Sequence, residues 1–174
     1  MSGRDGQVTA WISLGSNLGP SRELLRAALD HVDRLKRTTV TGVSSLYETP
    51  PWGDTDQGAF LNAVARLDTG LGPHVLLSSL LGIERALGRR RSSERRWGPR
   101  RIDLDLLLHG DHRLKVPELE LPHPRLAERA FVLVPLAELA PDLELPDHGA
   151  VRDCLAGLDR EGIRLIAGPG WSDD

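Results

Sequence analysis

The chain of 174 residues is poor in several residue types, and each shortage excludes a class of protein. One cysteine cannot form an internal disulfide, so we expect a reducing compartment, the cytoplasm. Aromatic residues make up 4% of the chain, too few for the stacking platform of a nucleic-acid-binding module. No apolar run is long enough to span a membrane, and residues 1–6 are unlike a signal peptide. We therefore expect one domain of residues 1–174, with flexible tails at 1–7 and 168–174, bound neither to nucleic acid nor to a membrane.

Lysine is scarce as well, and arginine carries the positive charge in one concentrated segment. The net charge is -3, but residues 85–101 contain eight arginines and one glutamate, a local +7, which leaves -10 for the rest. This asymmetry favours an anionic ligand bound at one place. Residues 89–101 show no hydrophobic periodicity, so we expect a long, mobile loop that is open until an anion binds.

Two aspartates interrupt the apolar run that follows this segment. Residues 102–108 are typical of a buried strand, in which Asp103 and Asp105 share one face while Ile102, Leu104 and Leu106 face the core. Two adjacent carboxylates need a positive partner. Next to so many arginines they favour a divalent cation that holds a polyphosphate, with ordinary ion pairs to arginine as the alternative.

Periodicity along the remaining chain predicts an α+β protein, one sheet layer covered by helices. We expect a first strand over 8–14, one further strand through Val40, Val43 and Tyr47, and others at 59–67, 102–108 and 163–166, with 113–116 pairing back as a short hairpin. Helices are expected over 20–37, 72–87 and 151–158, and over 126–139 with an interruption at Pro135.

The strand over 59–67 places Phe60 and Asn62 on one face. An aromatic ring with an amide beside it can stack on a flat heterocycle and hydrogen-bond its edge, although a core phenylalanine is the default interpretation. In the turn after the first strand, we expect Asn17 to hold a neighbouring loop.

At these motifs the sequence resembles the 6-hydroxymethyl-7,8-dihydropterin pyrophosphokinase family. The resemblance covers about residues 8–160 and is most specific at Arg96-Trp97-Gly98-Pro99-Arg100-Arg101-Ile102-Asp103-Leu104-Asp105. Shorter matches are Gly15-Ser16-Asn17, Tyr47–Gly53, Asp56-Gln57, Phe60–Ala63, Gly88-Arg89, and Pro122-His123 with Arg129 and Phe131.

The resemblance implies a ferredoxin-like α/β sandwich with a mostly antiparallel sheet. It implies transfer of pyrophosphate from ATP to the pterin's hydroxymethyl group, leaving AMP, in folate biosynthesis, by an enzyme that we expect to be a monomer. Asp103 and Asp105 would bind two Mg²⁺ ions and, with Arg89 and Arg100, form the catalytic set. The nucleotide would be bound by Leu77, Glu84, Arg89, Arg91, Trp97, Arg100, Leu106, His123 and Arg129, and the pterin by Thr49, Pro51, Trp52, Phe60, Asn62 and Phe131.

Two other functions compete with this interpretation. A metal-dependent nucleotidyltransferase could use Gly15-Ser16 with Asp103 and Asp105, but such enzymes usually carry both motifs in one strand–helix unit, and here they are far apart in the sequence. A nucleic-acid-binding ferredoxin-like module would need exposed aromatic residues on its sheet, which the composition does not supply.

Overall fold

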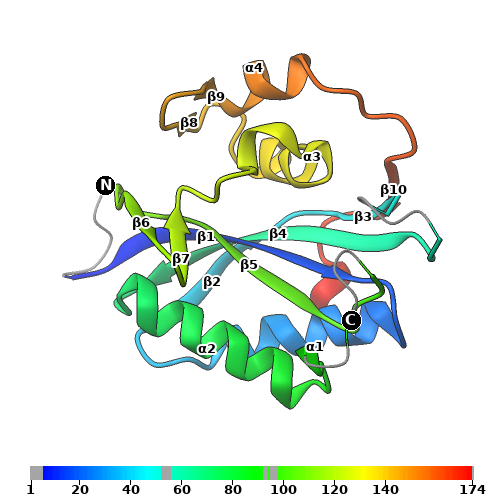
Figure 1. The fold of residues 1–174 in the computed structure, drawn as a ribbon, viewed down its shortest axis with the longest axis horizontal. Helices are drawn as coiled ribbons and strands as arrows, with labels where there is room; N and C mark the ends of the chain where they lie inside the picture. Colours follow the sequence, from blue (N-terminus) through cyan, green and yellow to red (C-terminus); the bar gives the residue numbers. More distant parts are fainter. Residues whose placement is uncertain (1–5, 52–55, 92–93, 95–97, 174) are drawn as a thin grey trace.

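The computed structural model describes residues 6–51, 56–91, 94 and 98–173. Their centre is a six-stranded antiparallel sheet with helices on both faces (Figure 1). The strands run in the order β10-β3-β4-β1-β5, and β2 also pairs with β4. Their bounds are β1 Val8–Ser16, β2 Thr38–Val43, β3 Leu46–Thr49, β4 Phe60–Thr69, β5 Asp103–His109 and β10 Arg164–Ala167. This is the α+β, ferredoxin-like sandwich that the resemblance implied.

One face of the sheet is covered by α1 (Ser21–Asp33) and α2 (Pro73–Ala86), which lie together in Figure 1. Leucines recur along α1 at helical spacing, so Leu24, Leu25 and Leu29 are buried on one side. Leu25 and Leu29 pack with the inward residues of the strands, among them Ile12 and Leu104, in the larger of two hydrophobic cores. The expected inward positions of the aspartate strand are confirmed.

The other face is covered by α3 (Ala130–Leu139) and α4 (Val151–Ala156), with the small hairpin of β8 (Glu144–Leu145) and β9 (Gly149–Ala150) beside them. Val64 and Leu107 from the sheet and Leu133 from α3 belong to this second core. A pocket lies on this face near the end of β1 and the starts of β4 and β5.

Two predicted elements differ from the structure in the first half of the chain. The helix expected over 20–37 ends at Asp33, because Arg37 has a positive φ of 53° and the chain turns there into β2. The strand expected through Tyr47 is two strands, β2 and β3. At the break, the N–H of Ser44 donates to the backbone oxygen of Val64, and the N–H of Val64 donates to Oγ of Ser44. Both backbone groups of Val64 therefore keep a hydrogen-bond partner between β2 and β3.

Two further predictions were wrong in the second half. Pro135 lies inside α3 without ending it, and the interruption falls instead at Arg129, which is extended between the 3₁₀ turn η2 (Leu126–Glu128) and α3. Residues 114–116 form β6, which pairs with β7 (Leu119–Leu121) and not with the aspartate strand. Leu119 and Leu121 are buried in the larger core, and this anchors the hairpin.

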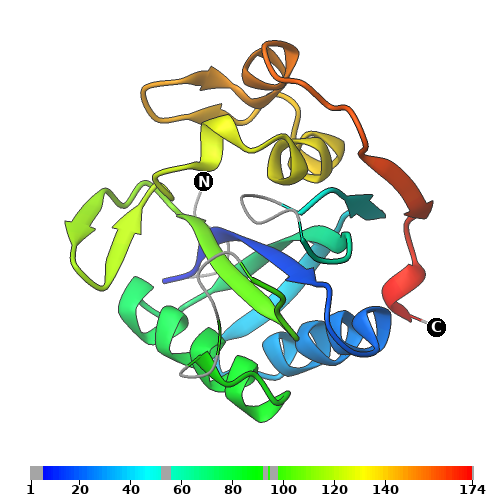
Figure 2. The same ribbon diagram turned by 45° about the vertical axis from the view of Figure 1, so that its right-hand side comes forward.

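The C-terminal segment is not the flexible tail that we expected. Figure 2 shows it running from α4 along the edge of the sheet to η3 (Trp171–Asp173), beside α1. Trp171 is 2% exposed, donates its indole N–H to the backbone oxygen of Ser44 and accepts at its own oxygen from Arg26. Among the described residues, no helix has the length and apolar character needed to cross a membrane.

Candidate active site

The site begins with a row of residues that face one another across four strands. Tyr47 of β3 lies opposite Asn62 of β4, Asn62 opposite Gly15 of β1, and Gly15 opposite Asp103 of β5. Cross-strand partners point to the same face of a sheet. In the next row Ser13 lies between Val64 and Asp105. The pairing therefore brings the aspartates and Asn62, which are distant in sequence, to one face.

Gly15 makes room for a neighbouring side chain in the middle of this row. A Cβ atom built on Gly15 would lie 2.7 Å from Oδ1 of Asn62 and 3.6 Å from Cδ1 of Phe60. A glycine inside a strand commonly marks a place where a ligand or another group approaches the backbone closely. Here the approaching group is the Asn62 amide, which covers the buried Gly15.

A pocket with about 750 Å³ of atom-free space, part of it open to solvent, covers these rows. It joins the aspartate pair, the aromatic pair and several basic residues in one cavity. The lining residues are Ser13, Gly15, Thr49, Pro50, Phe60, Asn62, Gly98, Arg100, Asp103, Asp105, His123, Arg129 and Phe131.

The two aspartates face different electrostatic environments. Asp103 accepts from Arg89 at 2.9 Å and from Arg100 at 3.4 Å. Burial and the adjacent negative charge of Asp103 raise the pKa of Asp105 to about 7, against the opposing effect of Arg129. The ion-pair alternative therefore describes Asp103, whereas Asp105 adds a carboxylate that is costly to ionise without a further cation.

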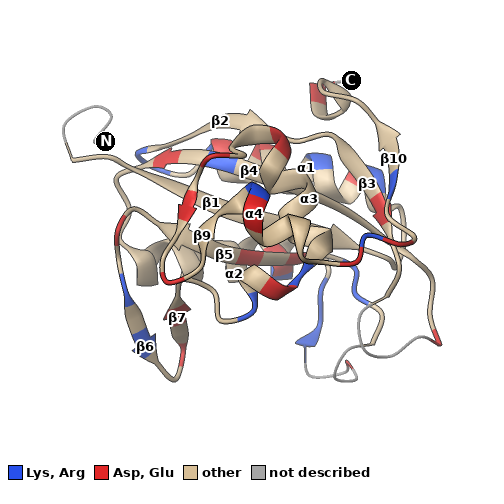
Figure 3. Ribbon diagram, turned by 90° about the horizontal axis from the view of Figure 1, so that it is seen from above, with Lys and Arg blue, Asp and Glu red and all other residues tan. Residues whose placement is uncertain are grey.

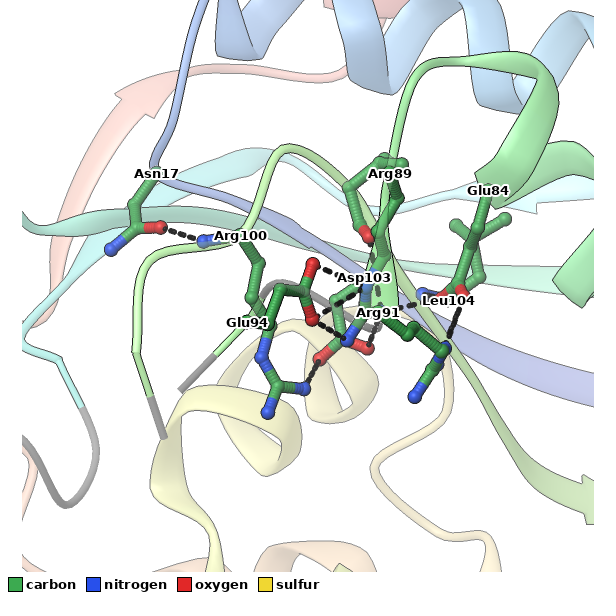
Figure 4. A network of polar contacts seen from close by, with 9 residues as sticks. Asn17, Glu84, Arg89, Arg91, Glu94, Arg100, Asp103 and Leu104 are labelled. Carbon is green, nitrogen blue, oxygen red and sulfur yellow. Dashed lines mark hydrogen bonds and ion pairs between the residues drawn. The ribbon is translucent and has the colours of Figure 1, made fainter. Parts of the chain in front are cut away.

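A buried network supports Asp103 from below (Figure 4). Glu84 of α2 is 1% exposed and accepts from the N–H of Leu104 at 2.8 Å and from Arg89 at 2.9 Å. Arg89 is 4% exposed; it also donates to the backbone oxygen of Ile102 and forms an ion pair with Glu94. Burial opposes the charge of Arg89, but its acidic partners more than compensate and raise the pKa of this guanidinium above its ordinary value.

This network corrects one expectation about the arginine-rich segment. We expected Arg89 to be free until an anion drew it inward, but its guanidinium already lies beneath Asp103 with three acidic partners. Arg91 is half-exposed and bonds the second oxygen of Glu84 at 2.9 Å. The positive charges of the segment are thus partly neutralised by the protein itself. Figure 3 shows basic positions on the loops beside α2 and also elsewhere, among them β6 and β10.

Asn17 holds the start of the aspartate strand and the 56–58 segment together. It accepts from the N–H of Arg100 at 2.7 Å and donates its own N–H to the oxygen of Arg100. Its side-chain amide donates to Gln57 and to the oxygen of Gly58. The prediction that Asn17 holds a neighbouring loop is confirmed, and it places Arg100 at the mouth of the pocket.

The aromatic side of the pocket comes from two elements. Phe60 lies at the start of β4 and Phe131 in the first turn of α3. Asn62, which is 8% exposed, donates to the hydroxyl of Thr49, so its orientation is set by the protein. The guanidinium of Arg129 lies 5.5 Å above the ring of Phe131.

His123 and Arg129 extend the pocket towards β5. Burial, together with Arg129, lowers the pKa of His123 to about 4, so the imidazole is neutral near pH 7. Its Nδ1 accepts from the N–H of Arg125 at 3.2 Å, which leaves the proton on Nε2. His123 is therefore a hydrogen-bond donor with no charge of its own.

Several residues expected at the site lie elsewhere. Leu77 and Leu106 pack with the larger core, Leu106 because it occupies the face of β5 opposite to the aspartates. Glu84, Arg89 and Arg91 line a separate recess beside α2. Trp52 and Trp97 lie outside the described residues, and Pro51 is not among the pocket's lining residues.

The sequence analysis missed Ser13, Gly15 as a lining residue, Pro50 and Gly98. The available signal was Gly15, because a glycine near the end of an otherwise apolar strand has a positional meaning. Nothing in the sequence around Ser13 predicted a place in the pocket. Ser13 lines the pocket because the register of β1 against β5 sets it opposite Asp105.

The donor set fits Mg²⁺ bound together with a polyphosphate. In the described part of the chain, no group of three or more His, Cys, Asp or Glu could hold a metal ion, so Asp103 and Asp105 would be the protein's carboxylates. Mg²⁺ is commonly held by one or two carboxylates, with water and substrate phosphates completing its shell. A cation there would also relieve the repulsion that raises the pKa of Asp105.

Comparison with known proteins gives one family. Residues 11–141 match the model of 7,8-dihydro-6-hydroxymethylpterin-pyrophosphokinase (HPPK). The chain is 49% identical over 158 residues to the 2-amino-4-hydroxy-6-hydroxymethyldihydropteridine pyrophosphokinase of Pseudomonas aeruginosa, covering 91% of this chain and 96% of that protein. It is 50% identical over 157 residues to the enzyme of the same name from Methylorubrum extorquens, covering 90% and 98%.

Longer proteins contain a similar part. The folic acid synthesis protein fol1 of Schizosaccharomyces pombe is 40% identical over 159 residues, which cover 21% of its length. The crystal structure of Plasmodium falciparum HPPK-DHPS, wild type with pteroate, superposes with a TM-score of 0.69 at 15% identity over 90% of this chain and 43% of that chain, so the likeness is one of fold. The sequence match over 11–141 and the near full-length identity to the two bacterial enzymes show that this chain belongs to the HPPK family.

Proposed function

We propose that the pocket between β1, β4, β5 and α3 is where this pyrophosphokinase transfers pyrophosphate from ATP to 6-hydroxymethyl-7,8-dihydropterin in folate biosynthesis, leaving AMP. The observation that carries the proposal is that one cavity joins an aromatic pair with an oriented amide to a carboxylate pair with basic residues. A flat heterocycle and a metal-bound polyphosphate would meet there, as the transfer requires.

The pterin lies between Phe60 and Phe131 in this proposal. Asn62, held by Thr49, hydrogen-bonds the amide-like edge of the ring, and Gly15 lets the Asn62 amide lie close to the backbone of β1. Pro51 and Trp52 stay predicted edge contacts. This arrangement directs the hydroxymethyl group towards β5 and its aspartates.

The phosphates lie over Asp103 and Asp105. Mg²⁺ held by these carboxylates would neutralise phosphate charge and orient the group to be transferred. Arg100 and Arg129 bind phosphate oxygens as cations, and neutral His123 donates a hydrogen bond from Nε2. These donors are held by the protein before ATP arrives, which limits the reorganisation needed at the transition state.

Arg89 and Glu84 act on the phosphates indirectly, because Glu84 bonds Arg89 and Arg89 bonds Asp103. Because Arg89 bonds Asp103 from the buried side, we assign it to the orientation of that carboxylate. Arg91 and Glu84 line the recess beside α2, where the nucleotide extends in this proposal. Leu77 and Leu106 support that region from the core, and Trp97 stays a predicted nucleotide contact.

We further propose that the chain acts as a single-domain monomer in the cytoplasm. Both cores are built on one sheet, as in a single domain.

The test is formation of AMP from ATP with Mg²⁺, measured with and without the reduced pterin. We expect AMP only when both substrates are present. Release of ADP, or of pyrophosphate without the pterin, would contradict the proposal; the latter would favour the nucleotidyltransferase alternative.

A further inference from the structure

Glu138 joins α3 to the sheet through hydrogen bonds, and it is not one of the residues that line the pocket. It lies in the last turn of α3, and its carboxylate accepts from the N–H of Ser45 at 2.9 Å and from the hydroxyl of Ser45 at 3.0 Å. Its other oxygen accepts from the hydroxyl of Tyr47 at 2.6 Å. One side chain thus bonds two residues of the segment that forms β3.

The sheet end of this link is next to the proposed pterin site. Ser45 is 4% exposed and lies at the break between β2 and β3, so its buried N–H obtains its acceptor from α3. Tyr47 lies directly opposite Asn62 in the β3–β4 ladder, and Thr49, two residues on, bonds Asn62. A shift of β3 therefore moves Asn62's partner and Pro50, both of which line the pocket.

The helix end of the link is also tied to the pocket. Phe131 and Glu138 are seven residues apart on α3, about two turns, so both point from one side of the helix towards the sheet. Phe131 enters the pocket at one end, and Glu138 bonds β3 at the other. The two residues belong to one continuous helix that includes Pro135, so a displacement at Glu138 changes the tilt of α3 and with it the height of the Phe131 ring.

We infer that Glu138 is a positioning residue that sets the spacing between Phe131 and the Phe60–Asn62 wall, and so the affinity for the pterin ring. The inference rests on the proposed function, because it assigns this slot to the pterin. Glu138 is exposed on its outer side and packs in neither core. Its loss opens no large cavity, and the expected effect falls on geometry more than on folding.

Burial and the adjacent carboxylate of Glu138 raise the pKa of Tyr47 above its ordinary value, so the phenol stays protonated and remains the donor. Tyr47→Phe then removes one hydrogen bond and leaves the ring's packing in place. It is the second variant for this test, should Glu138→Ala fold poorly.

The matched control is Glu48→Ala. Glu48 is on the same strand but on the opposite face, where it pairs with Arg164 across to β10. Like Glu138→Ala, this variant removes one negative charge, but it does so from β3 and leaves α3 unchanged.

The experiment measures two dissociation constants by calorimetry for the parent, Glu138→Ala, Glu138→Gln, Tyr47→Phe and Glu48→Ala. The probes are Mg²⁺ with α,β-methylene-ATP, and 6-hydroxymethylpterin added after saturation with that analogue. We expect Glu138→Ala to weaken pterin binding about tenfold while nucleotide binding stays within twofold, because small displacements of a binding wall are costly. Glu138→Gln, whose amide oxygen still accepts from Ser45, should recover much of the loss. The double variant with Tyr47→Phe should be no weaker than Glu138→Ala alone.

The outcomes separate this inference from the proposed function. Parent-like pterin affinity in Glu138→Ala or, if that variant does not fold, in Tyr47→Phe would overturn the inference and leave the function standing. An equal loss for both ligands, or the same loss in Glu48→Ala, would show a general effect on folding and would also overturn it. A parent that does not bind the pterin would refute the proposed function, and the inference with it.

Discussion

Replacing Asp105 by asparagine should make the ligand-free protein more stable at alkaline pH while abolishing its activity. Asp105 stands beside Asp103 in a buried strand, and burial with this neighbouring charge raises its pKa to about 7 from 3.8. The folded protein therefore binds a proton that the unfolded chain has already lost. Asparagine removes the ionisable group and keeps the shape.

The sign follows from linkage. When the folded state binds more protons than the unfolded state, stability falls as pH rises, here between about 4 and about 7, and is constant above. Between pH 5 and pH 7 the free energy of unfolding of the parent therefore falls by about 2.7 kcal/mol, at about 1.36 kcal/mol per pH unit. Asp105 retains some contact with pocket solvent, so we expect the advantage of Asp105→Asn to grow by about 1–3 kcal/mol between pH 5 and pH 8.

The assay is urea unfolding of parent and variant at pH 5, 6, 7 and 8, with a chelator present so that no divalent cation binds. Asp111→Asn, at the exposed turn after β5, is the control for removing one negative charge outside the pocket. AMP formation is measured in parallel and should be lost in Asp105→Asn, because a carboxamide is a much weaker ligand for Mg²⁺.

A difference between Asp105→Asn and the parent that does not change with pH would refute the reasoning, as would a variant that becomes relatively less stable above pH 7. Mg²⁺ with α,β-methylene-ATP should stabilise the parent more than the variant, because the cation takes the place of the missing positive neighbour. Equal stabilisation would remove Asp105 from the metal site.

Three other predictions concern the aromatic pair, the buried arginine and the C-terminal segment. Phe60→Ala and Phe131→Ala should each weaken pterin binding by about 1–3 kcal/mol, measured by calorimetry, with Mg–nucleotide affinity unchanged; equal weakening of both ligands would show that the slot is wrongly placed. Arg89→Ala should lower the free energy of unfolding by about 3–5 kcal/mol, because it leaves buried carboxylates without their cation. Arg91 is half-exposed, so Arg91→Ala should lower the same free energy by less than about 1 kcal/mol in the same urea titration. Trp171→Ala should cost about 3–5 kcal/mol in thermal or urea unfolding, and a cost near zero would restore the view of a free tail.

Local pattern was sufficient for the parts of this protein that depend on strand alternation. The shared face of Asp103 and Asp105, and that of Phe60 and Asn62, follow from a period of two residues, and the structure has both. The tie from Asn17 to a neighbouring segment was also predictable, because an amide in a tight turn seeks backbone partners.

Element boundaries were less predictable, because hydrogen bonds to distant residues decide them. The chain breaks between β2 and β3 where Ser44 and Ser45 obtain partners from Val64 and Glu138. Pro135 stays inside α3, since a helix can lose one hydrogen bond when its apolar side is buried.

What the sequence by itself determined is the chemistry: a carboxylate pair, a block of arginines and a ring-binding pair, at spacings that resemble one family. What only the tertiary structure decided is which of these groups face one another. Strand register places Asn62 and Asp103 on either side of Gly15, because it pairs residues that are far apart in sequence. Burial turned Arg89 from an expected free cation into the support of Asp103, because its partners Glu84 and Asp103 come together only once α2 packs on β5.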